Sequence, residues 1–341
     1  MKILPITLLI GAFFISCKKS PSADPTKLIQ NQDFPEGLKI DGHDFDSLVI
    51  ENCTFSGLPL SISNADYVTV RNCTFTNSKL DGIKVGFNGE ADHVWIENCS
   101  FKDIGFNGID SHQRAPNGTI VNCTFENMAT SQTGAAMAQP HHGIYWKGKN
   151  VHISGNTFIG ADQPFGNGIS VRSSGYVGGN KIIGVPKNGI MYYSNHPGDD
   201  SLVIENNFLA NNSYGIAMAS LGNEDYHNDV VIIRFNTIVS KENYSIYVSE
   251  LFEPTTRVEI YGNYAVNESG EFVKDFYELD SVYSNLFETS GTNFLDASSG
   301  DLHLTSGSPA IDYCAGLTVF PSTDFDGDLR DSGTLNAGAD E

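Results

Sequence analysis

The sequence has few basic residues: 20 Lys and Arg stand against 41 Asp and Glu in 341 residues, a formal net charge of −21. This shortage argues against sequence-independent binding to DNA or RNA, because such binding draws its affinity from Lys and Arg on phosphates. It also argues against an electrostatic hold on anionic membranes. Charged residues of either sign make up only 18%, whereas 34 glycines are present. That balance favours strands and turns over long solvated helices.

Long apolar runs are missing as well, apart from one near the start of the chain. Residues 3–15 follow Lys2 as an apolar run too short to span a bilayer, and Ser16-Cys17 ends it. This arrangement resembles a bacterial lipoprotein signal, in which the cysteine is lipidated; a plain secretory signal is the alternative. We therefore expect residues 1–17 to be a signal with lipid attachment at Cys17. The protein would be an exported outer-membrane lipoprotein, periplasmic or surface-facing, held to the membrane only through that lipid.

One short pattern, apolar-x-apolar-x-x-[Cys/Asn]-x-apolar, recurs ten times along the chain. Its pivot residues are spaced by 20 to 33 residues and are Cys53, Cys73, Cys99, Cys123, Asn156, Asn180, Asn207, Asn236, Asn263 and Asn285. A second pattern, [Asp/Asn/His/Tyr]-Gly-Ile-x-apolar, lies between copies and begins at Asp81, Asn107, His142, Asn167, Asn188 and Tyr214. Each repeat thus supplies two or three short strands, and a unit of this size must stack on its neighbours to bury its apolar face.

These repeats predict an all-β fold, a right-handed parallel β-helix of about ten rungs with an Asn/Cys ladder at a tight turn. Asn suits this turn because it tolerates left-handed backbone, and stacked amides can hydrogen-bond along the column. A β-sandwich or β-propeller would not repeat one turn residue in every copy. We expect a tether and N-terminal cap over 18–37, the β-helix over 38–312 and a C-terminal cap over 313–341. A monomer is expected.

The cysteines follow from the same repeat. Cys53, Cys73, Cys99 and Cys123 occupy one column on consecutive rungs. Export would permit disulfides, but the Cβ vectors of such a column run parallel, which opposes bridging. We therefore predict free, buried thiols that pack as small apolar groups. A zinc site is not expected, because the thiols form a row and not a tetrahedron.

The last segment of the chain departs from the repeat. Asp324-x-Asp326-Gly-Asp328 looks like a short calcium loop, since carboxylates at alternate positions are suitable calcium ligands. A turn that caps the last rung is the alternative. No cofactor is expected apart from calcium at these three aspartates.

Strand alternation in the Gly-Ile repeats places polar side chains in outward columns. The residue after each Ile reads Lys84, Asp110, Tyr145, Ser170, Met191, Ala217 and Tyr247, and two residues further on the column reads Gly86, His112, Lys147, Arg172, Tyr193, Ala219 and Ser249. The column before each Gly contains Asn107 and His142. These side chains predict a functional groove on the middle rungs, against the alternative of an ordinary solvated face. Loops at 126–139, 194–200 and 220–229 would wall such a groove, which would suit an extended polymer.

A family resemblance enters at two of these strands. Asn107-Gly108-Ile109-Asp110-Ser111-His112, followed by His142-Gly143-Ile144, resembles the active strands of mannuronan C5-epimerases and related β-helix polysaccharide lyases. Those epimerases carry Tyr-Gly-[Phe/Ile]-Asp-Pro-His and then a His-Gly step, so Asn107 stands for their Tyr and Ser111 for their Pro. The resemblance to the fold covers about residues 38–312. It implies a lyase or C5-epimerase that abstracts the C5 proton of a uronate-containing polysaccharide.

The residue types fit this chemistry. Arg172, Lys147 or Lys84 could neutralise the uronate carboxylate, and His112 or His142 could act as the base, with Asp110 to orient His112. Tyr145 or Tyr193 could act as the acid. We therefore predict catalytic roles for His112, His142, Tyr145, Lys147, Arg172 and Asp110, and substrate binding by Lys84, Asn107 and Tyr193.

Two other classes of function stay open. A glycoside hydrolase would need facing carboxylates, and only Asp81 and Asp110 offer themselves. A non-catalytic glycan-binding lipoprotein would use tyrosines as sugar platforms, together with Trp146, which the strand phase nevertheless places inward. The partner is a polysaccharide in each case. An acidic one is admissible because residues 1–174 carry 13 basic and 16 acidic residues, a net −3, whereas 175–341 carry 7 and 25, a net −18.

Overall fold

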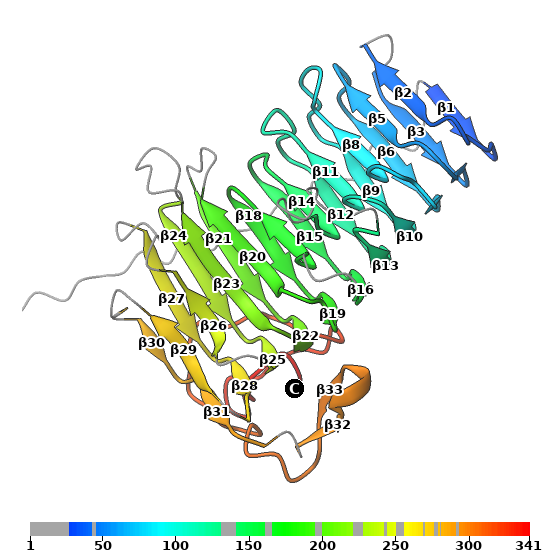
Figure 1. Ribbon diagram of the computed structural model, residues 1–341. Coiled ribbons are helices and arrows are strands. Elements are labelled where there is room, and N and C mark those ends of the chain that lie inside the picture. The colour runs from blue at the N-terminus through cyan, green and yellow to red at the C-terminus, as the bar shows by residue number, and fades with distance from the viewer. Residues whose placement is uncertain are drawn as a thin grey trace, which may run out of the picture.

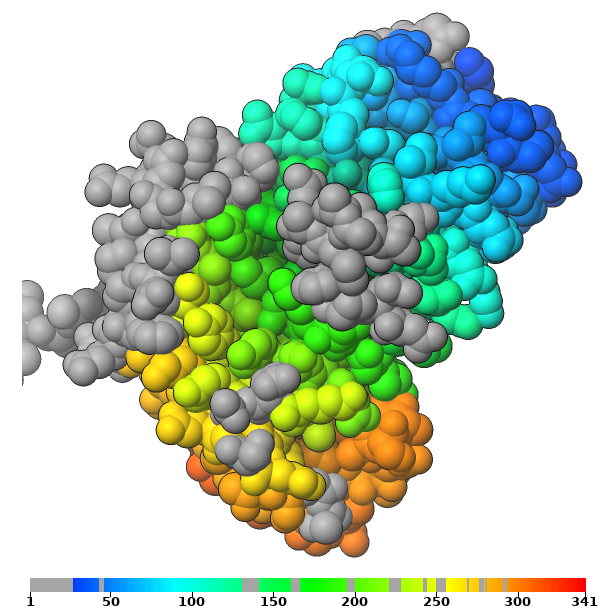
Figure 2. Space-filling model, in the orientation of Figure 1, coloured from blue at the N-terminus to red at the C-terminus, as the bar shows by residue number. Residues whose placement is uncertain are grey.

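The computed structural model describes residues 27–42, 46–130, 141–160, 166–194, 200–220, 228–241, 244–249, 256–268, 270–275, 279, 281–290 and 293–341. Over these ranges the chain winds as a right-handed parallel β-helix, which confirms the predicted fold (Figure 1). The rungs follow one another in chain order along an elongated body (Figure 2). Among the described residues, no helix has the length and apolar character needed to cross a membrane. The predicted signal and Cys17 lie outside the described residues.

Three parallel sheets form the sides of the helix. Sheet A contains β1 (Lys27–Gln30), β3 (Leu48–Glu51), β6 (Val68–Arg71), β9 (Trp95–Glu97), β12 (Thr119–Val121), β15 (Val151–Ser154), β18 (Gly175–Gly178), β21 (Ser201–Glu205), β24 (Val230–Arg234), β27 (Arg257–Tyr261) and β30 (Val282–Tyr283). Sheet B contains β4 (Thr54–Phe55), β7 (Thr74–Thr76), β10 (Ser100–Ile104), β13 (Thr124–Met128), β16 (Thr157–Ile159), β19 (Lys181–Ile183), β22 (Phe208–Asn212), β25 (Thr237–Ser240), β28 (Tyr264–Val266) and β31 (Leu286–Glu288). Sheet C contains β2 (Leu38–Asp41), β5 (Leu60–Ser63), β8 (Ile83–Val85), β11 (Ile109–Ser111), β14 (Ile144–Trp146), β17 (Ile169–Val171), β20 (Asn188–Ser194), β23 (Tyr214–Ser220), β26 (Tyr244–Val248) and β29 (Glu271–Asp275).

The predicted amide ladder is present at the turn between sheets A and B. Each Asn donates its side-chain amide to the Oδ1 of the next Asn, at 2.8 to 3.0 Å, from Asn156 through to Asn285. The left-handed backbone that the turn needs lies one residue before the ladder, at Asn52 (φ 53°) and Asn206 (φ 53°), for example. The expectation that the ladder residue itself adopts this conformation was wrong. The ladder side chain must point inward, so the preceding residue makes the sharp bend.

The Cys column continues the ladder toward the N-terminus. Cys53, Cys73, Cys99 and Cys123 are buried and free, as predicted. Each thiol points at a backbone carbonyl, and Cys99 Sγ lies 3.3 Å from Glu97 O. The two halves of the ladder meet where Asn156 Oδ1 accepts the backbone N–H of Cys123 at 2.9 Å. Burial raises the pKa of the Cys99 thiol, so this column is chemically inert packing.

Phenylalanines form a second column, directly behind the ladder. Phe55, Phe75, Phe101, Phe125 and Phe158 stack with ring centroids 4.6 to 4.7 Å apart. Gly82, Gly108 and Gly143 of the Gly-Ile repeat lie against these rings: a Cβ on Gly108 would come within 2.7 Å of the Phe125 ring and 2.6 Å of Gly143 O. The two sequence patterns are therefore parts of one packing unit, in which the glycine makes room for the aromatic ring.

Both ends differ from a plain stack of rungs. β1, within the segment assigned to tether and cap, already pairs with β3 in sheet A. The other end contains β32 (Phe294–Asp296), the short 3-10 helix η2 (Ala297–Ser299) and β33 (Asp301–Leu304). β32 and β33 pair in an antiparallel arrangement, with η2 between them. Residues 305–341, which we call the tail, then run back beside the distal rungs, where Arg330 Nη2 donates to Asn206 Oδ1 at 3.3 Å (Figure 1).

Candidate functional site

The outer face of sheet C carries the predicted columns. Lys84 pairs with Asp110, Asp110 with Tyr145 and Tyr145 with Ser170 in the strand register, so these residues follow one another on adjacent rungs. The Ile of each repeat and the residue two positions later are buried, including Trp146, which is fully inaccessible. Trp146 therefore cannot act as a sugar platform. The predicted phase of these strands is confirmed.

Lys147 and Asp110 form an ion pair between neighbouring rungs. Lys147 Nζ lies 2.7 Å from Asp110 Oδ1 and also donates to Ser111 O at 2.7 Å. Both side chains are largely covered, with 12% and 13% exposed. Burial raises the pKa of Asp110 to about 6, and Lys147 opposes that rise only in part. Burial lowers the pKa of Lys147 against the pull of the same partner. Burial therefore disfavours the charged form of both groups, and the carboxyl of Asp110 takes up a proton near pH 6.

Arg172 lies between two tyrosine rings. Its guanidinium carbon is 4.6 Å from the ring centroid of Tyr145 and 4.6 Å from that of Tyr193. Within the described ranges no carboxylate forms an ion pair with Arg172, and its buried Nε has no hydrogen-bond partner. Cation–π contacts hold the cation in place without neutralising it. The result is a fixed positive charge without an ion-pair partner among the described residues, suited to a carboxylate from outside.

The aromatic ring of Tyr145 contacts two cations, Lys147 and Arg172. Lys147 Nζ lies 4.0 Å from its centroid, and the His142 ring meets it edge-on at 5.0 Å. Burial raises the pKa of the Tyr145 hydroxyl. The hydroxyl therefore stays protonated at neutral pH and can donate a proton, which suits an acid.

Phe87 organises the N-terminal edge of the cluster and was not predicted. Lys84 Nζ and Lys147 Nζ lie 4.4 Å and 5.2 Å from its ring centroid, and the ring of His112 meets it edge-on at 5.8 Å. The sequence held a signal for this role, because Phe87 directly follows Gly86, which belongs to the second outward column. Ser111 was also missed as a contributor: its Oγ accepts the backbone N–H of Lys147 at 2.8 Å.

His112 lies on the outer face as predicted, beside Lys147. Its Nδ1 accepts the backbone N–H of Arg114 at 3.3 Å. Burial and the charges of Arg114 and Lys147 lower its pKa, so the ring is neutral at pH 7 with its proton on Nε2. In this tautomer the exposed nitrogen is a hydrogen-bond donor and not a base.

His142 and Asn107 are not on the outer face, and the prediction that they line a groove was wrong. They belong to a second internal ladder, in which Asn107 donates to Asp81 Oδ1 at 2.9 Å and accepts the His142 backbone N–H at 2.7 Å. His142 Nδ1 in turn accepts the Asn167 N–H at 3.1 Å. Both side chains are buried, because the position before the glycine turns inward to satisfy the backbone of the next rung. Burial lowers the pKa of His142 well below its usual value.

A small pocket of about 30 Å³ lies at the sheet B–sheet C turn, with His142 in its lining. Phe125, Met128, Phe158 and Pro186 are among its lining residues, none of which is charged. This cavity is therefore not suited to an acidic sugar. The loops predicted to wall a groove lie mostly outside the described residues, at 131–139, 195–199 and 221–227.

In the calcium candidate at the C-terminus, the carboxylate of the first residue, Asp324, already accepts hydrogen bonds from the backbone. Asp324 Oδ1 accepts the backbone N–H groups of Asp326 and Asp328 at 3.0 and 2.8 Å, and its Oδ2 accepts that of Glu341 at 3.1 Å. Asp326 turns away from Asp324, toward His303. In the part of the chain that the structure describes, the group of possible metal ligands that comes together is His303, Asp326 and Asp340.

Comparison with known proteins gives a match to the repeats. A family model described as a right handed beta helix region matches residues 59–263, which is more than half of the chain and includes the whole cluster on sheet C. No curated protein matches the sequence. Domains of this kind are common in polysaccharide-active enzymes and in carbohydrate-binding proteins. The chain belongs to the right-handed β-helix family.

Proposed function

We propose that the outer face of sheet C binds and acts on a uronate-containing polysaccharide, as a lyase or C5-epimerase. The observation that carries the proposal is Arg172, whose guanidinium is fixed between Tyr145 and Tyr193 with no ion-pair partner among the described residues. The C5 proton of a uronate becomes removable when the adjacent carboxylate is neutralised, because negative charge then delocalises onto that group. Arg172 supplies this neutralisation.

Asp110 is the proposed base. Its Oδ1 is held by Lys147, its Oδ2 is left for the substrate proton, and the carboxyl group with a pKa of about 6 is mostly ionised at pH 7. This assignment differs from the expectation for His142, which is buried and bonded through Nδ1. Lys147 is a positioning residue, since it fixes the carboxylate that removes the proton. His112 donates from Nε2 to a sugar hydroxyl, and Lys84 extends the positive surface.

Tyr145 is the proposed acid, between Asp110 and Arg172 on the face. In a lyase, Asp110 takes the C5 proton, the electron pair forms the C4–C5 double bond, and the C4–O bond breaks while Tyr145 protonates the leaving oxygen. In an epimerase the C4–O bond stays, and Tyr145 returns a proton to C5 from the opposite side. Both reactions use the same proton donor and acceptor, and they differ in where Tyr145 delivers its proton.

A hydrolase is disfavoured by the position of its second carboxylate. Asp81 is 3% exposed and already accepts two hydrogen bonds from Asn107 at one oxygen. Such a group cannot serve as an acid or a nucleophile on a polymer that lies on the outer face, so the described part of this cluster offers a single suitable carboxylate.

The test is a panel of polymannuronate, polyguluronate and polygalacturonate, with a neutral glucan for comparison. A lyase produces unsaturated ends that absorb in the ultraviolet, whereas an epimerase changes the uronate composition seen by proton NMR. Arg172→Ala should reduce kcat/KM by about 10²–10³-fold, as removal of a charge-stabilising donor does. Arg257→Ala, on the exposed face of sheet A, is the matched control and should leave it unchanged. Reducing ends without ultraviolet absorbance, or affinity without turnover, would refute the proposal in favour of a hydrolase or a binder.

The proposal includes export through the segment that ends at Cys17, which would bring the protein to an extracellular or periplasmic polymer. Labelling of cells with a fatty acid tests it: the wild-type chain should carry the label and Cys17→Ser should not. An unlabelled wild-type chain would contradict the lipid anchor without bearing on the sheet C site.

A further inference from the structure

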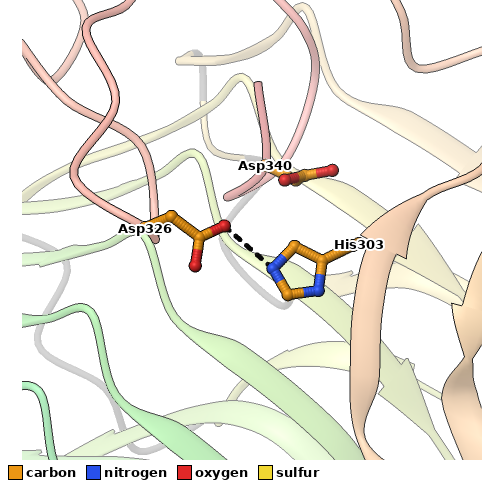
Figure 3. Close-up of side chains that lie close together, drawn as sticks. All are labelled: His303, Asp326 and Asp340. Carbon is orange, nitrogen blue, oxygen red and sulfur yellow. Dashed lines mark hydrogen bonds and ion pairs between the residues drawn. The ribbon is translucent and has the colours of Figure 1, made fainter.

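His303, Asp326 and Asp340 come from three separate segments and converge at one point (Figure 3). His303 is on β33, Asp326 is in the turn after Asp324, and Asp340 is next to the end of the tail. One potential ligand atom from each lies within 4.8 Å of the others. None of the three takes part in the sheet C cluster. Their convergence therefore needs a separate explanation.

The imidazole of His303 is held in a defined orientation. Its Nδ1 pairs with Asp301 Oδ1, which leaves Nε2 pointing at Asp326 Oδ2 at 2.9 Å. The ring also meets Phe208 edge-on, with centroids 5.2 Å apart. A carboxylate on one imidazole nitrogen with the other nitrogen directed at acidic oxygens is the arrangement that surrounds metal-binding histidines. Asp301 thus occupies the place of an outer carboxylate.

The third carboxylate is held from the opposite side. Asp340 Oδ2 accepts the backbone N–H of Leu304 at 2.7 Å, which leaves its other oxygen for a ligand. Arg330 pairs with Glu341 at 2.9 Å, and among the described residues it forms no ion pair with His303, Asp326 or Asp340. One imidazole therefore faces three carboxylates, counting Asp301, and a dication would offset that excess.

We propose that His303, Asp326 and Asp340 bind a divalent transition metal of the zinc class. One nitrogen and two carboxylate oxygens suit Zn²⁺ and its neighbours, with a water as the remaining ligand, whereas Ca²⁺ prefers oxygen ligands alone. The ion would join β33 to two points of the tail. Its role is structural: it holds the tail against the distal rungs, far along the chain from the proposed catalytic face.

Isothermal titration of the full chain with Zn²⁺, after treatment with a chelator, tests the proposal. We expect one ion per chain and an increase in Tm of a few degrees at saturation, on the order of 3–6 °C. Asp326→Asn keeps the side-chain shape and removes a ligand charge, so it should weaken Zn²⁺ binding by at least about tenfold. Asp331→Asn, an exposed aspartate of the same tail, is the matched control and should bind like the wild type.

Competing arrangements give different results. If protonated His303 simply pairs with Asp301 and Asp326, Zn²⁺ will not raise Tm, and the proposal is overturned. Binding that survives Asp326→Asn and His303→Asn would place the ion elsewhere on the chain, which also overturns it. A response to Ca²⁺ but not to Zn²⁺ would refute the assigned metal class. These readouts use no polysaccharide, so their failure is distinguishable from failure of the proposed catalytic function.

Discussion

The ammonium of Lys147 and the carboxylate of Asp110 lie 2.7 Å apart on neighbouring rungs, with both side chains largely covered. Burial outweighs this attraction for Asp110, since its pKa is raised to about 6 in spite of the cation. A base must be ionised to work, so kcat/KM should fall as the pH decreases through about 6. The ion pair thus sets the lower pH limit of the proposed activity.

Lys147→Met should shift the acidic limit of kcat/KM to higher pH. The substitution removes the charge that lowers the pKa of Asp110 and leaves burial unopposed, so a larger part of Asp110 is protonated at neutral pH. The pH profile of kcat/KM measures this shift. Lys102→Met is the matched control, because Lys102 pairs with Glu126 between rungs of sheet B at 2.6 Å. An unchanged acidic limb in Lys147→Met would exclude Asp110 as the base.

The Asn ladder should be far more sensitive to truncation than the Cys column. Asn207 donates to Val177 O, Glu205 O and Asn236 Oδ1, and its own Oδ1 accepts from Asn180. Asn207→Ala leaves several buried polar groups unpaired, which should cost about 3 kcal/mol or more of unfolding free energy. Cys99→Ala removes only weak thiol contacts and should cost about 1 kcal/mol. Denaturant melts of the two variants measure the difference, and equal losses would contradict the role given to the amides.

The fold was predictable because its pattern is local and repeated. The pivot residues and the Gly-Ile strands fix which side chains point inward, and strand register then places Lys84, Asp110 and Tyr145 in one column. The inward–outward alternation of side chains ends where a strand ends, however. It therefore does not predict which way a side chain points in a turn. Asn107 and His142 sit at such a turn, where the hydrogen-bonding needs of the next rung turn them inward.

Contacts between distant segments could not be predicted from the sequence, for a different reason. No repeat connects His303 with Asp326 and Asp340, and only the return of the tail along the distal rungs brings them together. Likewise, the pKa of Asp110 depends on how far its rung is buried, and no local pattern encodes that quantity.

Gly108→Ala should destabilise the helix at the catalytic rung. The added Cβ would lie 2.6 Å from Gly143 O, which is fixed by its hydrogen bond from Ile109 N–H, and 2.7 Å from the Phe125 ring, which is fixed by stacking. Overpacking of this kind costs about 1–3 kcal/mol and should displace β11, which carries Asp110. Gly307→Ala is the control, since a Cβ there meets nothing within 4 Å. Thermal melts compare the two, and equal Tm values would show that the glycine is not needed for packing.

Arg330→Leu should release the tail while leaving the sheet C cluster in place. The Arg330 side chain is fully covered, and it joins the tail to the distal rungs by donating to Asn206 Oδ1 at 3.3 Å and by lying 4.8 Å from the Phe235 ring. Within the tail it pairs with Glu341 and donates to Gly338 O, both at 2.9 Å. Loss of this buried cation leaves Glu341 unpaired and should cost about 3–5 kcal/mol of unfolding free energy. The tail also loses its contacts with Asn206 and Phe235 on the distal rungs.

Hydrogen exchange over residues 305–341 in the presence of a chelator measures this release without a contribution from metal. Protection of the tail should fall in Arg330→Leu and stay the same in Arg257→Leu, because Arg257 is 65% exposed and pairs only at the surface of sheet A. Turnover of polysaccharide should persist, since β8 to β20 do not contact the tail through Arg330. If the rungs of sheet C lose protection together with the tail, docking of the tail is coupled to the whole β-helix and the tail is not an independent unit.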